Sequence, residues 1–203
     1  MSTERVVAEV DAHEESDRRD QILEAANQCF TQLGIQRTSV QDVARMANVS
    51  RGTVYRYFED RNILIAAAIE FGAQKFYQQV AAAMAKKATL AEKVGAMAET
   101  QAKILLEHRT RNRLMADDAE LMRHIISDGD SAVRRTTAFL VPYVREAQER
   151  GEVGAGIDVT AASEWLARII YSFSTVNEAL TFDMSKPATV RRYVEKFAIN
   201  GLR

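Results

Sequence analysis

The stretch TSVQDVARMANVSRGTVYRYFEDRNIL, residues 38–64, holds two short helical patterns with a tight turn between them at Asn48. Thr38 or Ser39 is expected to cap the first helix, and Ser50 is well suited to cap the second, because their side-chain oxygens can accept hydrogen bonds from free backbone N–H groups. Two short helices joined by such a turn predict a helix-turn-helix.

A helix before this stretch completes a three-helix unit. Residues from about Arg18 to Leu33 have helical apolar spacing, and Gly34 is expected to end that helix. The second short helix should end near Phe58, and Asp60 should cap a longer helix that continues to about Lys87. The positions expected to face the core of this unit are Ile22, Ala26, Cys29, Phe30, Leu33, Val40, Val43, Ala44 and Ala47.

The helix that begins after Ser50 has one face to bury and another to offer. Val54 and Phe58 are one turn apart, so they should pack together onto the two preceding helices. Arg51 lies at the helix start, where free N–H groups and the positive end of the helix dipole favour phosphate. The opposite face and its flanks combine long donors with aromatic rings and include Gly52, Thr53, Tyr55, Arg56 and Tyr57.

Residues 18–64 resemble the DNA-binding domain of the TetR family of bacterial regulators. The shared features are a Gly that ends the first helix, Thr-Ser-Val-x-x-Val-Ala in the second, and Val-Ser-x-Gly-Thr-Val-Tyr-x-Tyr-Phe in the third. Asp60-Arg61 stands where the family usually has Ser-Lys, and Asn48 replaces a commoner Gly, which Asn tolerates because it accepts left-handed geometry. Beyond Leu64 only the helical layout and the length are similar.

The resemblance implies a division of labour on this surface. Thr38, Ser39, Tyr55, Tyr57 and Arg61 would hold phosphates. Arg51, Thr53 and Arg56 would reach base edges, where an arginine bound to guanine by two hydrogen bonds contributes about 1–3 kcal/mol of discrimination. Gln41 is a weaker base-contact candidate, Ser50 is a further DNA-binding candidate, and Gly52 lets the backbone approach DNA closely. On an arbitrary helix, by contrast, the arginines would be solvated and Tyr55 would only pack.

The remainder of the chain also favours helix, so the expected fold class is all-α with about nine helices. We expect a flexible acidic arm at 1–17, a helix-turn-helix domain at 18–64 and a helical effector-binding and dimerisation domain at 65–203. In that body, helices are expected at about Thr89–His108, Arg111–Asp118, Ala119–Ser127, Ser131–Arg150 with Pro142 inside, Val159–Thr181 and Pro187–Ile199.

Charge and composition narrow the function classes. The net charge of −1 over 203 residues argues against a chain that coats nucleic acid indiscriminately. Residues 18–61 nevertheless carry seven arginines against five acids, whereas residues 1–17 carry six acids and one arginine. The single cysteine, Cys29, excludes a disulfide framework and is expected in the core. No apolar run approaches the roughly 18 residues of a membrane span. The resemblance implies a cytoplasmic bacterial protein, nucleoid-associated when bound to DNA.

Catalytic and metal-binding chemistry is not indicated. There is no G-x-S-x-G elbow or phosphate-binding glycine loop, and the Gly151–Gly156 segment follows a helix rather than a strand. Glu120 and His124 are four residues apart and could share a metal. His108, Asp117 and Asp118 are nearby in sequence, but nothing fixes any of them as a third ligand. We therefore expect no enzyme activity, metal or cofactor.

Two apolar sets in the body predict a ligand pocket and a dimer interface. TetR-like proteins bind an inducer in the body, so a hydrophobic or amphipathic small molecule is expected there, although such residues are most often core. The pocket candidates are Met97, Leu105, His108, Met115, Met122, Phe139, Tyr143, Trp165, Arg168, Ile169 and Phe173. The dimer candidates are Leu166, Ile170, Val176, Leu180, Val190, Tyr193, Val194 and Phe197.

The resulting hypothesis is a homodimeric regulator, most simply a repressor, that binds a palindromic DNA operator and changes affinity with a small-molecule effector. A DNA-binding dimer without an effector is the first alternative. An all-helical enzyme is the second, and it would need a catalytic cluster that the sequence does not present.

Overall fold

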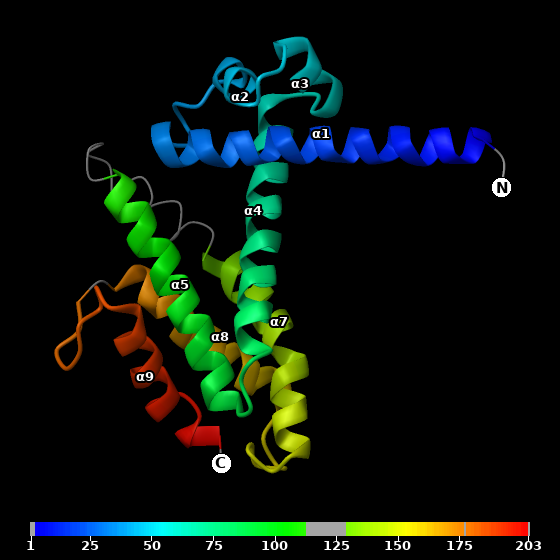
Figure 1. The fold of residues 1–203 in the computed structure, drawn as a ribbon. Coiled ribbons are helices and arrows are strands. Elements are labelled where there is room, and N and C mark those ends of the chain that lie inside the picture. The colour runs from blue at the N-terminus through cyan, green and yellow to red at the C-terminus, as the bar shows by residue number, and fades with distance from the viewer. Residues whose placement is uncertain (1–2, 113–128, 177, 203) are drawn as a thin grey trace. The chain divides into compact units, whose positions relative to one another are not determined.

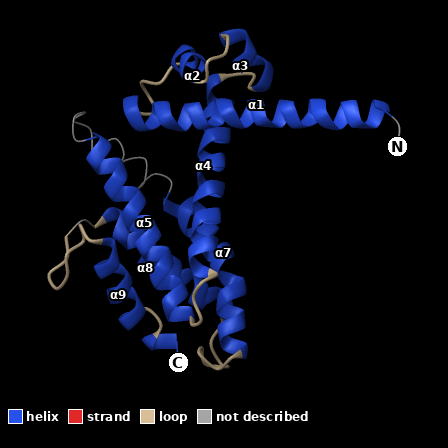
Figure 2. Ribbon diagram, viewed as in Figure 1, coloured by secondary structure: helices blue, strands red, loops and turns tan. Residues whose placement is uncertain are grey.

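The computed structural model describes the backbone of residues 3–112, 129–176 and 178–202, and these residues form helices and loops without a β-strand (Figures 1 and 2). The expected all-α class is therefore confirmed, and no helix in the described ranges is long and apolar enough to cross a membrane. The helices are α1 (Thr3–Leu33), α2 (Val40–Met46), α3 (Arg51–Tyr57), α4 (Arg61–Met84), α5 (Leu90–Asn112), α7 (Gly129–Glu149), α8 (Val159–Thr175), α9 (Pro187–Phe197) and the 3-10 helix η1 (Asn200–Leu202).

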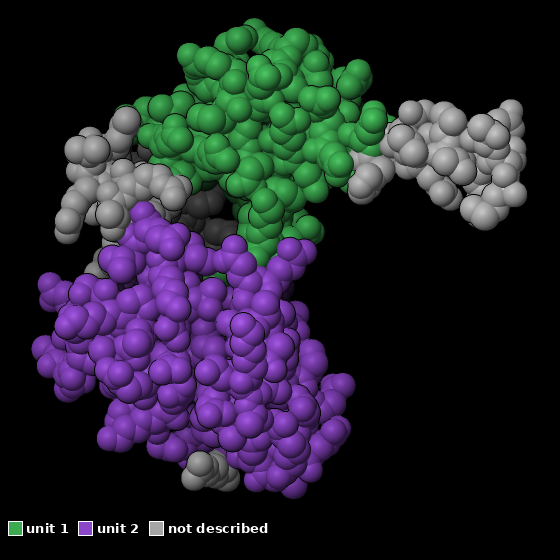
Figure 3. Space-filling view, viewed as in Figure 1, with its two compact units in different colours: residues 1–76 green, residues 77–203 purple. Residues whose placement is uncertain are grey.

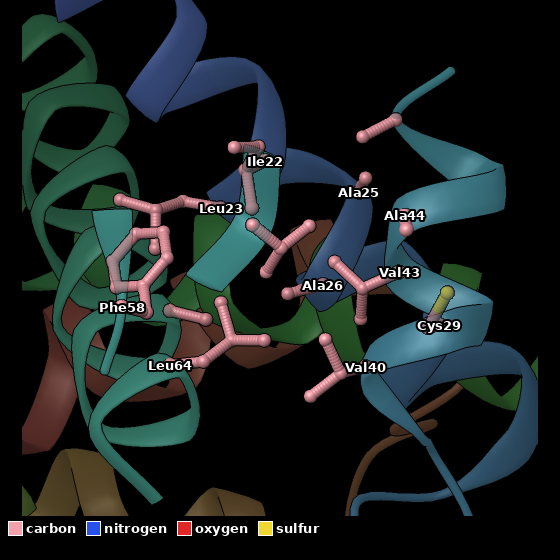
Figure 4. Packing of buried hydrophobic residues seen from close by; sticks show 13 residues of the cluster. Ile22, Leu23, Ala25, Ala26, Cys29, Val40, Val43, Ala44, Phe58 and Leu64 are labelled. Atoms are coloured by element: carbon pink, nitrogen blue, oxygen red, sulfur yellow. The ribbon is translucent and has the colours of Figure 1, made fainter. Parts of the chain in front are cut away.

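The chain divides into two compact units, residues 1–76 and 77–203, with the boundary inside α4 (Figure 3). The core of the first unit is formed by α1, α2, α3 and the first turns of α4 (Figure 4). Ile22 and Leu23 of α1, Val43 of α2, Phe58 after α3 and Leu64 of α4 are almost completely buried. Fully burying one such side chain contributes about 1.5–3 kcal/mol.

Most of the core positions expected in this unit are confirmed. Cys29 is buried, and burial raises the pKa of its thiol. Phe30 is partly buried against the same cluster. Leu33 differs, because it lies in the last turn of α1 and more than a third of its surface is exposed. Helical spacing placed it on the apolar face, but the helix runs past the core at this end.

The ends of the helices in this unit follow local chemistry. Gly34 has a positive φ of 83°, which ends α1, and Asn48 has a φ of 53°, which turns the chain between α2 and α3. Ser50 caps α3, its Oγ accepting a hydrogen bond of 3.0 Å from the backbone N–H of Thr53. Asp60 caps α4 through Oδ1, which accepts from the N–H groups of Asn62 and Ile63.

The first helix begins earlier than expected. Residues 3–17, expected to form a flexible arm, continue α1 toward its N-terminus. This segment contains neither Gly nor Pro, so no helix-breaking residue separates it from the amphipathic part that follows.

In the second unit, α5 packs against α8 and α9, and α7 packs against α8. Gly95 allows the approach of α5 to α9, since a Cβ at this position would lie 2.5 Å from Cγ of Glu195. The α8 helix ends at Thr175 rather than near Thr181. Near this end, the hydroxyls of Ser172 and Thr175 hydrogen-bond to backbone carbonyls three residues earlier, which offers the backbone an alternative to helix continuation.

Candidate nucleic-acid interface

The α3 helix is held by the side chains that it buries and by the turn before it. Val54 points into the core of the first unit, and Phe58, the C-cap of α3, is buried beside it, as their spacing predicted. The turn is closed by a hydrogen bond of 2.9 Å from the N–H of Val49 to the carbonyl of Ala44. Gln21 of α1 donates to the carbonyl of Ala47 at 2.9 Å. The opposite face of α3 is thereby directed away from the core.

Two arginine–tyrosine pairs lie on α3. The guanidinium of Arg51 lies 5.3 Å from the centroid of the Tyr55 ring and donates to its hydroxyl at 3.1 Å. The guanidinium of Arg56 lies 5.2 Å from the centroid of Tyr57 and 3.5 Å from its hydroxyl. Both arginines and Tyr55 are exposed, whereas Tyr57 is half-buried against the core. Stacking restricts the rotamers of both guanidinium groups while leaving N–H donors available to a partner.

The polar residues at the start of α3 are engaged with one another. The hydroxyls of Ser50 and Thr53 are 2.8 Å apart, and Thr53 is half-buried. Gly52 is exposed, and a Cβ there would meet only Ser50 Oγ at 3.7 Å. Internal packing therefore does not require a glycine at this position, and the exposed backbone remains open to a close approach from outside.

The start of α2 carries a capping box. Ser39 Oγ accepts from the N–H of Asp42, and Asp42 Oδ2 accepts from the N–H of Ser39 at 3.0 Å. The hydrogen bonds from the Ser39 side chain and backbone lower the pKa of Asp42. Arg45 also pairs with this carboxylate. Gln41 lies exposed beside the box.

Two residues expected to hold phosphates have other partners in the structure. Thr38 is only 3% exposed, and its hydroxyl donates to the carbonyl of Gly34 at 2.8 Å, which does not fit a side-chain contact with DNA. The guanidinium of Arg61 donates hydrogen bonds to backbone carbonyls of the loop between α1 and α2, so its donors are not all directed to solvent. Sequence reasoning missed both arrangements because the partners are backbone atoms placed by the fold.

The expected pocket residues whose side chains the structure describes differ in their exposure. Trp165 is 52% exposed, and Arg168 is exposed on the surface of α8, where it pairs with Glu164. Met97 lies in the core. Leu105, Ile169 and Phe173 are half-buried. Three other pocket candidates lie outside the residues or side chains that the structure describes, namely His108, Met115 and Met122. The same is true of the metal candidates Asp117, Asp118, Glu120 and His124.

An aromatic cluster joins α4 and α7 in the second unit. The rings of Tyr77 and Phe139 are 4.9 Å apart, those of Phe139 and Tyr143 are 5.4 Å apart, and the Tyr77 hydroxyl lies 2.9 Å from Oγ1 of Thr136. Lys93, which is buried, lies over Tyr143 and pairs with Glu146 at 3.1 Å. The Lys93 hydrogen bond lowers the pKa of Glu146.

Phe139 and Tyr143 were expected from the sequence, whereas their partners Tyr77 and Lys93 were not. The signal for Lys93 was helical spacing, since it lies three residues after Leu90 and four before Met97, both of which are buried. In the part of the chain whose side chains are described, no group of three His, Cys, Asp or Glu residues is placed to hold a metal ion.

The expected dimer residues fall into two groups. Leu166, Ile170, Val190 and Val194 are buried within their own protomer, which leaves little of their surface for a second copy. Spacing placed them on apolar helix faces, and within the same protomer α8 packs against α7 and α5 while α9 packs against α5. The expected residues that remain exposed are Val176, Leu180, Tyr193 and Phe197, with Trp165 as an exposed apolar residue of the same helix pair.

Aromatic contacts connect two members of this exposed group, Tyr193 and Phe197, with neighbouring rings. The ring of Tyr193 stacks on Phe182 at 4.5 Å and lies 5.0 Å from Phe197, while Phe173 meets Tyr193 edge-on. Phe182, in the loop before α9, was not among the expected interface residues, because no helical spacing marks a loop residue.

Comparison with known proteins agrees with this geometry. Residues 22–75 match the model of the family described as bacterial regulatory proteins, tetR family. The chain is 24% identical over 166 residues to the fatty acid metabolism regulator protein of Bacillus subtilis, which covers 79% of this chain and 80% of that protein. It is 43% identical over 54 residues to the HTH-type transcriptional regulator BetI of Pseudomonas fluorescens, about 27% of each chain.

Solved structures show the same fold over nearly the whole chain. GusR of Salmonella enterica aligns with a TM-score of 0.64 at 20% identity, over 92% of this chain and 95% of that one. The regulator FadR of Bacillus subtilis in complex with stearoyl-CoA aligns with a TM-score of 0.59 at 21% identity, over 90% of this chain and 98% of that one.

Proposed function

We propose that this chain, which belongs to the TetR family of bacterial regulatory proteins, acts in the bacterial cytoplasm as a homodimeric repressor. The dimer binds a palindromic operator through α3. The observation that carries this proposal is the pair of exposed arginines on α3, each held against a tyrosine ring. Arg51 and Arg56 reach base edges in the major groove, where bidentate contacts with guanine supply sequence discrimination.

The phosphate contacts of this surface come from the residues around those arginines. Gln41, exposed at the start of α2, stays a weaker base-contact candidate. Tyr55 and Tyr57 offer hydroxyl groups on the flanks of α3, and Ser39 is exposed beside the first turn of α2. Neutral donors of this kind hold the register of a protein on the duplex without reading sequence. Gly52 adds an exposed backbone segment with no side chain to obstruct the approach.

Dimerisation follows from the apolar surface that α8, α9 and the loop between them leave exposed. Trp165 and Phe197 are about half exposed, and Tyr193 adds a third large ring. The rings of Phe182, Tyr193 and Phe197 contact one another, and a cluster of partly exposed apolar rings favours an interaction site, for which a second copy of the chain is the partner that two-fold symmetry favours. Two α3 helices would then enter successive major grooves about 34–36 Å apart, which requires a palindromic operator.

The effector is a hydrophobic or amphipathic small molecule bound by the second unit. A related regulator is named for fatty acid metabolism, and a structurally similar one was solved with stearoyl-CoA, an amphipathic molecule. The α4 helix belongs to both units of the chain, so a ligand that displaces its C-terminal part changes the DNA-binding unit through the same helix. A coupling of about 1–3 kcal/mol alters operator affinity by roughly 5–150-fold.

The decisive experiment selects operator DNA with the purified protein from a library of random-sequence duplexes, followed by footprinting on the selected sequence. A palindrome with two protected half-sites one helical turn apart is the expected result. Failure to enrich any sequence would overturn the DNA-binding proposal.

The effector is tested separately, with stearoyl-CoA as the probe and coenzyme A and stearate as controls. The acyl thioester is expected to stabilise the protein against heat and to release the protein from the selected palindrome. If neither stearoyl-CoA nor a broad panel of apolar compounds alters stability or binding, the chain is a DNA-binding dimer without an effector.

A further inference from the structure

Arg61, the first residue of α4, has its guanidinium enclosed by the loop between α1 and α2. Its Nε donates to the carbonyl of Thr38 at 3.0 Å. Its Nη2 donates to the carbonyl of Gln36 at 3.2 Å and to that of Ile35. One side chain thus engages three backbone carbonyls within a four-residue segment, and all of these atoms belong to the first unit.

The electrostatics of this position explain why the guanidinium turns toward the loop. A cation in the first turn of a helix faces the positive end of that helix's dipole, which is unfavourable. The loop carbonyls follow directly after the C-terminal end of α1, where partial negative charge accumulates and cations are stabilised. Asp60, which caps α4, adds a carboxylate beside Arg61 in the sequence. The Arg61 cation is therefore favoured at the end of α1 rather than in the field of its own helix.

The segment that Arg61 holds leads directly into the helix-turn-helix. Thr38 closes the loop by donating from its backbone N–H to the carbonyl of Gly34 at 3.1 Å, and Ser39 is the N-cap of α2. The position of the Thr38 carbonyl therefore determines where α2 starts. Because α2 and α3 pack against each other, the start of α2 also affects the orientation of α3.

We propose that Arg61 is a positioning residue for the DNA-binding unit, which fixes residues 35–38 to the start of α4 and so holds α2 in the orientation that DNA requires. This role rests on the proposed function and replaces the phosphate contact that the sequence suggested. The Nε and Nη2 donors are committed to carbonyls, and Arg61 acts on DNA through the loop.

The proposal distinguishes arginine from lysine. The guanidinium presents donors on separate nitrogens in a rigid plane, so it can engage carbonyls at different positions together. A lysine ammonium concentrates its donors on one atom and cannot reproduce this arrangement, although it carries the same charge. A phosphate contact, in contrast, tolerates lysine as a point charge.

Backbone amide exchange in the free protein tests, without DNA, whether Arg61 holds residues 35–38 in place. The reporters are the N–H groups of Thr38, Asp42 and Val43, all bonded within the loop or the first turn of α2, and the N–H of Phe58, bonded to Val54, is the internal control. Arg61→Lys and Arg61→Ala should both accelerate exchange at the reporters by roughly tenfold, with Phe58 unchanged. Unchanged exchange at the three reporters in both variants overturns the proposal.

The second readout is the affinity for the palindrome that the wild-type protein selects. This affinity is measured at several salt concentrations and at a temperature well below the unfolding temperature. Both Arg61 variants should bind about tenfold more weakly, with the wild-type salt dependence. Arg145→Ala, which removes an exposed arginine from α7, is the charge-matched control and should bind as wild type.

Two binding outcomes would contradict a positioning role. A phosphate contact would leave Arg61→Lys near wild type and lower the salt slope of Arg61→Ala by about one. Faster exchange with wild-type operator affinity would reduce Arg61 to a stabilising residue. If the wild-type protein selects no DNA, the proposed function fails, and the positioning role fails with it. The exchange rates would still show whether Arg61 holds residues 35–38 in place.

Discussion

The Arg51 guanidinium lies over the Tyr55 ring, 5.3 Å from its centroid, and donates a hydrogen bond of 3.1 Å to its hydroxyl. The two residues are one helical turn apart on α3, so the pair forms without help from any other element. Tyr55 thereby restricts the directions in which Arg51 can extend, before any partner is bound.

Tyr55→Phe separates the ring from the hydroxyl. If the hydroxyl holds a phosphate and the ring positions Arg51, Tyr55→Phe should weaken operator binding, and Tyr55→Ala should weaken it by a further factor of roughly 2–5, because an exposed cation–π contact contributes about 0.5–1 kcal/mol. Fluorescence anisotropy measures both. Equal losses in the two variants would instead assign the role to the hydroxyl alone, as a phosphate contact.

Arg56→Ala should remove base discrimination. The expected loss is about 1–3 kcal/mol in the ratio of operator binding to binding of an unrelated duplex, with the largest relaxation at one position of each half-site. Competition binding with single-base operator variants checks this, and Arg145→Ala serves as the control for charge. A uniform loss over all sequences would mean that Arg56 contacts phosphate and reads no base.

The capping box of α2 should make the first unit sensitive to acid. Hydrogen bonds from Ser39 hold the pKa of Asp42 below its ordinary value of 3.8, so the stabilisation is present above that value and is lost as the pH falls through the lower folded-state pKa. Asp42→Asn keeps an acceptor but removes the charge. Its unfolding temperature should lie below that of wild type near neutral pH, and the difference should shrink below about pH 4.

The unfolding midpoints of both proteins, measured by circular dichroism across this pH range, test the prediction. Because Glu92, Glu146 and Asp183 also have lowered pKa values, the difference between the two proteins is informative, and the wild-type curve alone is not. A difference that stays constant with pH would show that the charge of Asp42 contributes nothing.

Gly95→Ala should destabilise the second unit. Its Cβ would lie 2.5 Å from Cγ of Glu195 and 3.2 Å from Cγ of Arg191, so α5 and α9 must separate or both side chains must shift. Overpacking of this kind costs about 1–3 kcal/mol. Gly156→Ala is the matched control, since a Cβ there meets nothing within 4 Å. Denaturant unfolding that gives the same stability for both variants would contradict the close packing of α5 and α9.

Phe197→Glu should dissociate the proposed dimer. Phe197 is half exposed and lies 5.0 Å from the ring of Tyr193, so a charge here should disfavour burial against a second copy. Sedimentation at micromolar concentration is expected to show a dimer for wild type and for Ala138→Glu, an exposed site on α7, and a monomer for Phe197→Glu. A wild-type monomer would exclude the dimer.

The helix-turn-helix was largely predictable because local signals specify it. Ser50 caps α3 as expected, Gly34 and Asn48 adopt the positive φ angles that their residue types permit, and Val54 and Phe58 are both buried. Each of these depends on neighbours within about one helical turn. The exposed face of α3 follows from the same periodicity, since a residue opposite a buried one must face outward.

The second unit was less predictable because its helices have more than one apolar side. Helical spacing showed that Leu166 and Val190 would be buried, but it could not say whether the covering surface was a second copy or the same chain. It likewise placed Trp165 in a pocket, although half of its surface is exposed. Burial was predictable here, whereas the partner that causes it was not.

The amino-acid sequence was enough to identify an all-helical chain, the helix-turn-helix and the outward arginines of α3, because periodicity and capping act over a few residues. The packed structure was needed to show that Thr38 is buried, that Arg61 binds the carbonyls of the loop before α2, and which apolar residues remain exposed on α8 and α9. Those properties depend on atoms far apart along the chain, and only folding brings such atoms within hydrogen-bonding and van der Waals distance.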